Sequence, residues 1–181
     1  MTSGQIFAVV GPSGAGKDSL IAGAMAVLPH LVWARRVITR PTGAGGEPFE
    51  GVTDTEFARR KALGQFCLDW QAHDLAYGIP VSITHDLAAG RDVIFNGSRE
   101  ALGVAFARFP QLIVILITAS PATLAQRLAD RGREARADIA QRLSRPDFAM
   151  PNGIIARVVT NDGSLERGVA LFLQALQPVR A

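Results

Sequence analysis

Short apolar runs of strand length recur along the chain, and segments with a helical pattern separate them. The apolar runs predict strands at residues 5–10, 31–39, 66–72, 92–95, 112–117 and 154–160. Helices are predicted at residues 18–28, 53–63, 100–108, 120–131, 138–145 and 165–177, and a turn at Tyr77–Pro80 should lead into a helix ending near Gly90. Strands that alternate with helices are typical of an α/β fold, a mostly parallel sheet with helices on both faces.

The segment 40–80 interrupts this alternation. Its first part, residues 41–53, is rich in glycine and proline and predicts an irregular loop. Thr53 and Glu56 then have the spacing of a capping box at the start of a short helix. We interpret residues 40–80 as a lobe inserted beside the sheet, a natural place for a second substrate. Residues 1–39 and 81–181 form the core of the same single domain.

A glycine-rich string lies between the first predicted strand and the first predicted helix. This order of strand, loop and helix is the context of a phosphate-binding loop. Glycines let successive backbone N–H groups point at one anion, and the following helix adds the positive end of its dipole. The string therefore predicts an ATP site at Gly11, Pro12, Ser13, Gly14, Ala15, Gly16, Lys17, Asp18 and Ser19.

Lys17 fits the G-x-x-x-x-G-K pattern and can reach the β- and γ-phosphates as a point charge. The next position usually carries a serine or threonine that holds Mg²⁺, but here it is Asp18, and Ser19 follows. A carboxylate can bind Mg²⁺ directly or through water. We expect Mg²⁺ at this position, and the pattern leaves open whether Asp18 or Ser19 contacts it. The alternative role of Asp18 is to favour the helix N-terminus electrostatically.

Charge and composition narrow the class of partner. The net charge is only +3, without a dense basic run, so a nucleic-acid partner is not expected. No apolar run reaches the roughly 18–20 residues that span a membrane, and no signal peptide is visible. Cys67 is the single cysteine, which excludes an internal disulfide. We therefore expect a cytoplasmic protein. The three histidines are scattered without ligand spacing and predict no metal site.

Several short strings occur in the order seen in guanylate kinases, which the chain resembles over nearly its whole length. They are the phosphate loop, Thr39-Arg40, Tyr77-Gly78, the Arg127 to Arg133 run and Asn161-Asp162. The chain departs from guanylate kinases at several positions. Besides Asp18, Gly43 stands where guanylate kinases carry a second arginine, the loop before Phe57 lacks their tyrosine, and the middle strand ends in Asn96 rather than an acidic segment.

These departures resemble one relative of guanylate kinases, the ribose 1,5-bisphosphate phosphokinase family of phosphonate degradation. Its characteristic strings are matched here by Gly11–Ser19, Ile38–Arg40, Tyr77-Gly78, Asn96–Arg99, Arg131–Glu134 and Thr160–Leu165. The resemblance implies that ATP and ribose 1,5-bisphosphate, a small phosphorylated sugar, give ADP and 5-phosphoribosyl 1-diphosphate. A phosphate acceptor is largely ionised at neutral pH and needs no strong general base, which agrees with the lack of a carboxylate at the end of the middle strand.

The resemblance also implies roles for individual residues. Residues 131–137 resemble a lid that brings arginines to the transferred phosphate, with catalytic roles for Lys17, Arg127, Arg131 and Arg133. Asn161 and Asp162 resemble the loop beside the adenine. Ser98 and Arg99 follow the carboxyl end of a predicted strand, where α/β sheets bind ligands. The acceptor-binding residues are expected to be Arg40, Glu47, Asp69, Tyr77, Ser98, Arg99 and Arg142.

Two alternatives remain open at this stage. A guanylate kinase would use Asp69 near the position that reads guanine, whereas the missing loop tyrosine and Gly43 argue against a base-reading pocket. A non-catalytic protein-binding module of the same fold tends to lose the phosphate-loop lysine, which this chain keeps as Lys17. A homodimer is compatible with either reading.

Overall fold

A computed structural model describes residues 3–42, 47–130, 150–151 and 153–177. Its central sheet has the order β2-β7-β1-β8-β9, and all neighbouring strands run parallel. The α/β fold and the mostly parallel sheet expected from the sequence are therefore confirmed. The strands of this sheet are β1 Ile6–Val10, β2 Val32–Trp33, β7 Val93–Asn96, β8 Ile113–Thr118 and β9 Ala156–Thr160.

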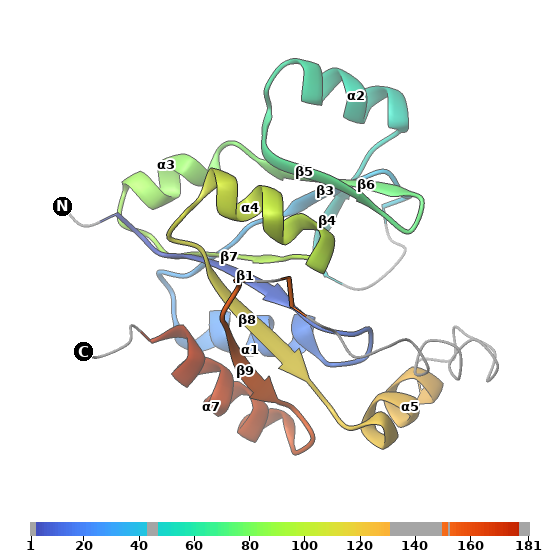
Figure 1. Ribbon diagram of the computed structural model, residues 1–181, viewed down its shortest axis with the longest axis vertical. Helices are drawn as coiled ribbons and strands as arrows, with labels where there is room; N and C mark the ends of the chain where they lie inside the picture. Colours follow the sequence, from blue (N-terminus) through green and yellow to red (C-terminus); the bar gives the residue numbers. More distant parts are fainter. Residues whose placement is uncertain (1–2, 43–46, 131–149, 152, 178–181) are drawn as a thin grey trace.

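Helices cover both faces of the central sheet (Figure 1). On one face lie α1 Lys17–Val27 and α7 Leu165–Leu176, and on the other lie α3 Ile83–Ala88, the 3₁₀ turn η1 Arg99–Ala101 and α4 Leu102–Arg108. Strand β1 is fully buried between two hydrophobic clusters, with alternate side chains in each cluster. Because both faces of β1 are covered, its sequence is a continuous apolar run.

A second sheet forms the inserted lobe, with the order β4-β3-β6-β5. It consists of β3 Arg36–Ile38, β4 Phe49–Gly51, β5 Phe66–Ala72 and β6 Leu75–Pro80, and α2 Asp54–Ala62 lies at its outer side (Figure 1). Leu68, Trp70 and Ile79 of this sheet share one hydrophobic cluster with Leu102 and Ala105 of α4. The lobe is thereby packed onto the core through α4. Helix α5 Pro121–Asp130 follows β8.

Two details of the strands differ from the sequence-based expectation. The strand predicted at residues 31–39 is broken at Ala34-Arg35, so that β2 joins the central sheet and β3 joins the lobe. Apolar character cannot reveal which sheet a segment joins. Part of the predicted irregular loop forms β4. The helix predicted at 138–145 and the lid predicted at 131–137 lie outside the described residues.

The predicted turn at Tyr77–Pro80 is wrong, because these residues belong to β6. The turn between β5 and β6 lies instead at His73 and Asp74, which have positive φ angles of 53° and 59°. A Cβ atom on Gly78 would lie 2.7 Å from the ring of Phe66. Gly78 therefore serves close packing within the sheet and not chain reversal.

The fold makes one stability prediction at α2. Thr53 caps this helix by accepting a hydrogen bond from the Glu56 backbone N–H at 3.2 Å. We expect Thr53→Ala to lower the free energy of unfolding by about 1 kcal/mol, measured by urea denaturation. Thr55→Ala, at an exposed position in the first turn of the same helix, is the control and should cause no loss. Equal stability of the two variants would contradict the capping role.

Among the described residues, no helix combines the length and the apolar character that crossing a membrane requires.

Candidate active site

The glycine-rich string forms a loop between β1 and α1. Gly14 and Gly16 have φ angles of 86° and 91°, which favour glycine. A Cβ atom on Gly16 would also lie 2.6 Å from Asn161 Nδ2. No side chain caps the first turn of α1, so its backbone N–H groups are available to an anion. The loop thus has the backbone conformation and the helix dipole that a phosphate group requires.

Lys17 lies across this loop. Its Nζ donates hydrogen bonds to the carbonyl oxygens of Gly11 at 2.9 Å and Pro12 at 3.1 Å. The ammonium group is therefore held over the first residues of the loop, where it can reach a phosphate bound by the N–H groups.

The loop is held from behind by residues after β8 and β9. Asn161 is buried, and its Nδ2 donates a hydrogen bond to the Ala15 carbonyl at 2.8 Å. Arg127 of α5 donates to the same carbonyl at 3.5 Å. Asp162 accepts a hydrogen bond from the Ser120 N–H at 2.7 Å, and this bond lowers the pKa of the Asp162 carboxyl. Asn161 therefore positions the phosphate loop, and Asp162 links the turn after β9 to the start of α5.

Asp18 takes part in a buried polar network. Asn96, the last residue of β7, uses both hydrogens of Nδ2, one to Asp18 Oδ1 and one to Glu47 Oε2, each at 2.7 Å. Asn96 and Glu47 are only 3% and 7% exposed. Buried carboxylates need such partners, because an unpaired buried charge is very unfavourable. The amide of Asn96 therefore joins a carboxylate of the phosphate loop to a carboxylate of the lobe.

Arg36 of β3 extends this network into the lobe. Its Nη2 forms an ion pair with Glu47 Oε1. Its guanidinium lies over the rings of Tyr77 at 4.9 Å and Trp70 at 5.9 Å, which stack on each other. Burial lowers the pKa of Arg36 to about 10, so the group stays charged at neutral pH. Asp18, Asn96, Glu47 and Arg36 thus form one connected chain, which we call the interlobe network.

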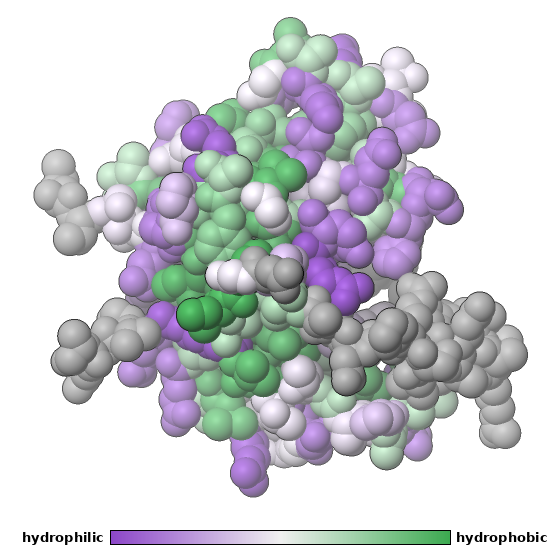
Figure 2. Space-filling model, viewed as in Figure 1, coloured by the Kyte–Doolittle hydropathy of each residue, from purple (hydrophilic) through white to green (hydrophobic). Residues whose placement is uncertain are grey.

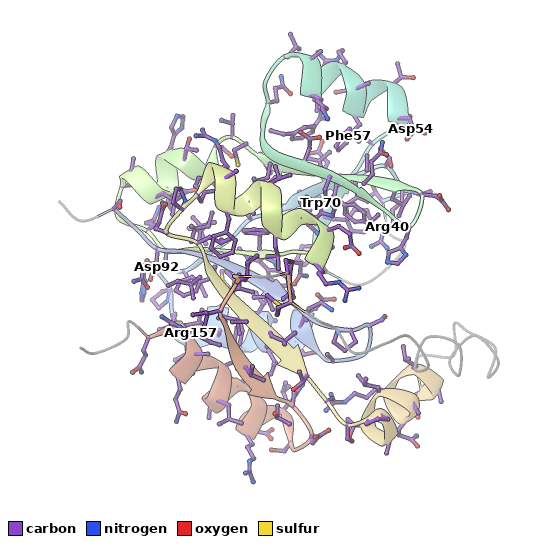
Figure 3. All side chains as sticks on the ribbon, in the orientation of Figure 1. Arg40, Asp54, Phe57, Trp70, Asp92 and Arg157 are labelled. Carbon is purple, nitrogen blue, oxygen red and sulfur yellow. The ribbon has the colours of Figure 1, made fainter. Side chains whose placement is uncertain are left out.

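Arg40 follows β3, and its guanidinium lies over the ring of Phe49 at 4.2 Å. Figure 3 shows Arg40 and Trp70 on the core-facing side of the lobe, whereas Asp54 and Phe57 belong to α2 on its outer side. Hydrophilic residues cover the right-hand side of the molecule at the level of the lobe in Figure 2. Arg40 is close enough to Arg36 for its charge to contribute to lowering the Arg36 pKa, after the larger effect of burial.

The chain was compared with known proteins. No family model matches it. A ribose 1,5-bisphosphate phosphokinase PhnN from Agrobacterium fabrum is 45% identical over 172 residues, which cover 93% of this chain and 94% of that protein. The PhnN protein of Chromobacterium violaceum is 46% identical over 177 residues, covering 97% and 95% of the two chains. The chain belongs to the ribose 1,5-bisphosphate phosphokinase family.

Some relatives of the phosphokinase family are longer. A bifunctional ribose 1,5-bisphosphokinase-thymidine phosphorylase from Cupriavidus necator is 49% identical over 176 residues. The match covers 97% of this chain but only 29% of that protein. The chain thus spans less than a third of the length of the bifunctional relatives that it matches.

Solved structures agree on the fold. The guanylate kinase of Anaplasma phagocytophilum matches with a TM-score of 0.66 at 16% identity, covering 97% of this chain and 88% of that one. A gluconokinase from Sinorhizobium meliloti matches with a TM-score of 0.54 at 17% identity, over 97% and 93% of the two chains. The chain therefore has the fold of guanylate kinase-like P-loop kinases.

The acceptor-binding residues predicted from the sequence do not all lie together. Glu47 and Tyr77 both contact Arg36, in the interlobe network or beside it. Asp69 instead forms an ion pair with Lys61 of α2. It lines a cavity of about 480 Å³ beneath α2, together with Asp54 and Phe57. Thr39 and Trp70 line the same cavity, and the acceptor role of Asp69 stays a prediction.

The other site residues predicted from the sequence lie in different surroundings. Ser98 caps the 3₁₀ turn η1, accepting a hydrogen bond from the Ala101 N–H at 3.3 Å. Arg99 opens this turn directly after the carboxyl end of β7. Ser19 is exposed one position beyond Asp18, which leaves Asp18 as the residue facing the interlobe network. The lid arginines Arg131 and Arg133, and Arg142, lie outside the described residues, so their roles stay predictions.

Sequence reasoning missed the role of Arg36 and the bridging role of Asn96. Arg36 lies inside a predicted apolar strand, where a charged residue is itself a signal, because buried strands seldom contain an unpaired arginine. Asn96 ends a strand whose three preceding residues are fully buried, so its side chain had to find polar partners at the sheet edge.

Within the described part of the chain, no cluster of three His, Cys, Asp or Glu residues could hold a metal on its own.

Proposed function

We propose that the chain transfers the γ-phosphoryl group of ATP to the 1-phosphate of ribose 1,5-bisphosphate, giving ADP and 5-phosphoribosyl 1-diphosphate. The observation that carries this proposal is the hydrogen bond between Asp18 and Asn96. These two residues belong to the two strings that separate this family from guanylate kinases in the sequence. Their direct contact means that the departures form one site, and the curated PhnN relatives at 45% and 46% identity bear the name of this reaction.

ATP binds through the phosphate loop in this proposal. The backbone N–H groups of the loop hold the β-phosphate, and Lys17 neutralises charge on the β- and γ-phosphates. The loop conformation depends on Asn161, which holds Ala15 from behind. Arg127 lies at the same carbonyl and approaches the loop from α5. Arg131 and Arg133 complete the positive charge around the transferred group.

Mg²⁺ fits the residues present. Asp18 follows Lys17 directly, and its carboxylate shares Asn96 with Glu47, so two buried or half-buried carboxylates and an amide gather beside the phosphate loop. Oxygen ligands of this kind suit Mg²⁺, which keeps several waters and binds through one or two carboxylates plus phosphate oxygens. Asp18 would hold the ion, directly or through water, and the ion would neutralise the transferring phosphates.

The acceptor binds between the lobe and the core. Arg40 lies on the core-facing side of the lobe (Figure 3), Tyr77 stacks on Trp70, and Ser98 and Arg99 follow β7 of the core. An ionised phosphate acceptor needs orientation and charge neutralisation more than a general base. The same proposal describes the chain as a cytoplasmic enzyme of phosphonate degradation.

A coupled assay of ADP release tests the function. The protein is supplied with ATP, Mg²⁺ and either ribose 1,5-bisphosphate or GMP, and the products are identified by mass spectrometry. We expect turnover with ribose 1,5-bisphosphate and formation of 5-phosphoribosyl 1-diphosphate. Turnover with GMP alone would instead make the protein a guanylate kinase. ATP binding without turnover of either acceptor would contradict the proposed reaction.

A further inference from the structure

Arg36 has more hydrogen-bonding capacity than its described surroundings use. A guanidinium carries five N–H donors. Glu47 is the hydrogen-bonding partner of Arg36 among the described residues, and Nε is buried without one. The Arg36 side chain is only 14% exposed. A buried cation with unused donors is unfavourable, because those donors have lost water without gaining a protein partner.

The aromatic rings fix the orientation of this guanidinium. Tyr77 and Trp70 stack at a centroid distance of 5.3 Å with nearly parallel planes, and Arg36 lies over both. Contact with aromatic faces holds the planar group without using its N–H donors, which point outward along its edges. The donors of Arg36 are therefore oriented in advance for a planar or tetrahedral anion.

The position of Arg36 brings such an anion close to the phosphate loop. One carboxylate, Glu47, and one amide, Asn96, separate Arg36 from Asp18, and each contact is a direct hydrogen bond or ion pair. Asp18 follows Lys17 in the chain. An anion on Arg36 would thus lie between the lobe and the residues that hold the phosphates of ATP.

We propose that Arg36 is an acceptor-binding residue, and that its guanidinium binds the phosphate that receives the phosphoryl group. This inference rests on the proposed function and adds to it a ligand contact that the sequence did not predict. The incoming phosphate completes the hydrogen bonds of Arg36 and competes with Glu47 for its Nη2.

The net charge of the interlobe network sets a condition for the binding of an anion at Arg36. Arg36 carries one positive charge, whereas Asp18 and Glu47 carry two negative charges, so the network repels an anion unless a cation is added. Mg²⁺ held at Asp18 would supply that cation beside the network. Phosphate should therefore bind at Arg36 more tightly when Mg²⁺ is present.

Calorimetric titration with inorganic phosphate tests this inference without turnover. The protein is first loaded with Mg²⁺ and a non-hydrolysable ATP analogue, so that the phosphate loop is filled. We expect Arg36→Gln to weaken phosphate binding by about 10- to 100-fold, as expected for lost hydrogen bonds from a charged group. Arg36→Lys should give an intermediate loss of phosphate affinity, because lysine keeps the positive charge but not the paired N–H donors of the guanidinium. Arg35→Gln, at the exposed neighbouring arginine, is the matched control and should bind as the wild type does.

Glu47→Gln separates ligand binding from a structural role of the ion pair. It removes the competing carboxylate and leaves Arg36 in place, so phosphate should bind at least as tightly as to the wild type. If Arg36 merely anchored Glu47, both variants would weaken phosphate binding alike. Thermal denaturation of each loaded variant shows whether that variant is folded under the conditions of the titration.

Two results would overturn the inference: a loaded wild type that binds no phosphate, and an Arg36→Gln variant that binds phosphate as Arg35→Gln does. The failure of the proposed function is a different result. If the wild type does not turn over ribose 1,5-bisphosphate but phosphate binding still depends on Arg36, the phosphate site stands and the acceptor is another phosphate compound. In kinetics, Arg36→Gln should raise the KM for the acceptor and leave the KM for ATP unchanged.

Discussion

Lys17→Ala is expected to lower turnover by about 10³-fold while the protein remains folded. The Lys17 ammonium lies across the phosphate loop, bonded to the Gly11 and Pro12 carbonyls, and it is the cation nearest to the proposed γ-phosphate in the described loop. Removal of one preorganised charged donor from a site of charge development typically lowers kcat by about 10²–10³-fold. We expect a loss at the upper end of this range, because phosphoryl transfer depends mainly on positioning and charge neutralisation.

The other lysine provides the control for this experiment. Lys61 pairs with Asp69 on the α2 side of the lobe, and its side chain is 58% exposed. Lys61→Ala should therefore keep nearly all of the activity in the same coupled assay. Substantial turnover by Lys17→Ala would support the non-catalytic reading of the phosphate loop, in which activity comes from elsewhere. Circular dichroism of both variants would show whether the fold is retained.

The parts of the site that follow from local sequence were predictable. Strand, loop and helix at residues 6–27 appear as expected, because the positive φ angles of Gly14 and Gly16 and the apolar run of β1 are local properties. The capping of α2 by Thr53 has the same local origin. Such features depend on residues a few positions apart, so the sequence pattern contains the information that determines them.

The interlobe network was not predictable in the same way. Its hydrogen bonds join residues 78 positions apart, between Asp18 and Asn96, and 49 positions apart, between Glu47 and Asn96. They form only because β7 pairs with β1, while β3 leaves the central sheet at Ala34-Arg35. Each residue could be proposed alone from its motif. Their mutual pairing depends on tertiary contacts that spacing does not encode.

The acceptor role of Asp69 stays a prediction, and its position in β5 shows how sensitive such a prediction is to register. The sequence placed it near a base-reading position, but alternate residues of a strand point to opposite faces of a sheet. Trp70 stacks on Tyr77 and supports Arg36, and Asp69 next to it pairs with Lys61. A shift by one position in a strand thus changes the face and the proposed role.

Asn96→Asp should be the most damaging conservative substitution at the interlobe network. The side chain keeps its shape, but an amide that donates two hydrogen bonds becomes a carboxylate that faces Asp18 and Glu47 at the present distances of 2.7 Å. Each hydrogen bond to a charged group contributes about 1.5–3 kcal/mol, and the added charge is buried. We expect the free energy of unfolding to fall by about 3 kcal/mol or more at neutral pH, by urea denaturation.

The pH dependence of this loss identifies its cause. The introduced carboxyl lies beside two carboxylates, so its pKa in the folded protein rises above the unfolded value of about 3.9. The folded variant then binds more protons than the unfolded one, so its stability relative to the wild type falls as pH rises through the raised pKa. We expect the difference between Asn96→Asp and the wild type to be small near pH 4 and large at pH 7. A difference independent of pH would instead indicate a packing defect.

Adding Glu47→Gln to Asn96→Asp should recover part of the lost stability. The introduced amide can keep an oxygen toward Arg36, in place of Glu47 Oε1, and donate an N–H to the new carboxylate, in place of Oε2. One repulsive contact becomes a hydrogen bond, while the contact with Asp18 stays repulsive, so recovery is partial. Glu47→Gln alone should destabilise the wild-type background, because it weakens the ion pair with Arg36. If the two substitutions were simply additive, Asn96 would not connect the two carboxylates energetically, and the lobe and the phosphate loop would have to be coupled by other contacts.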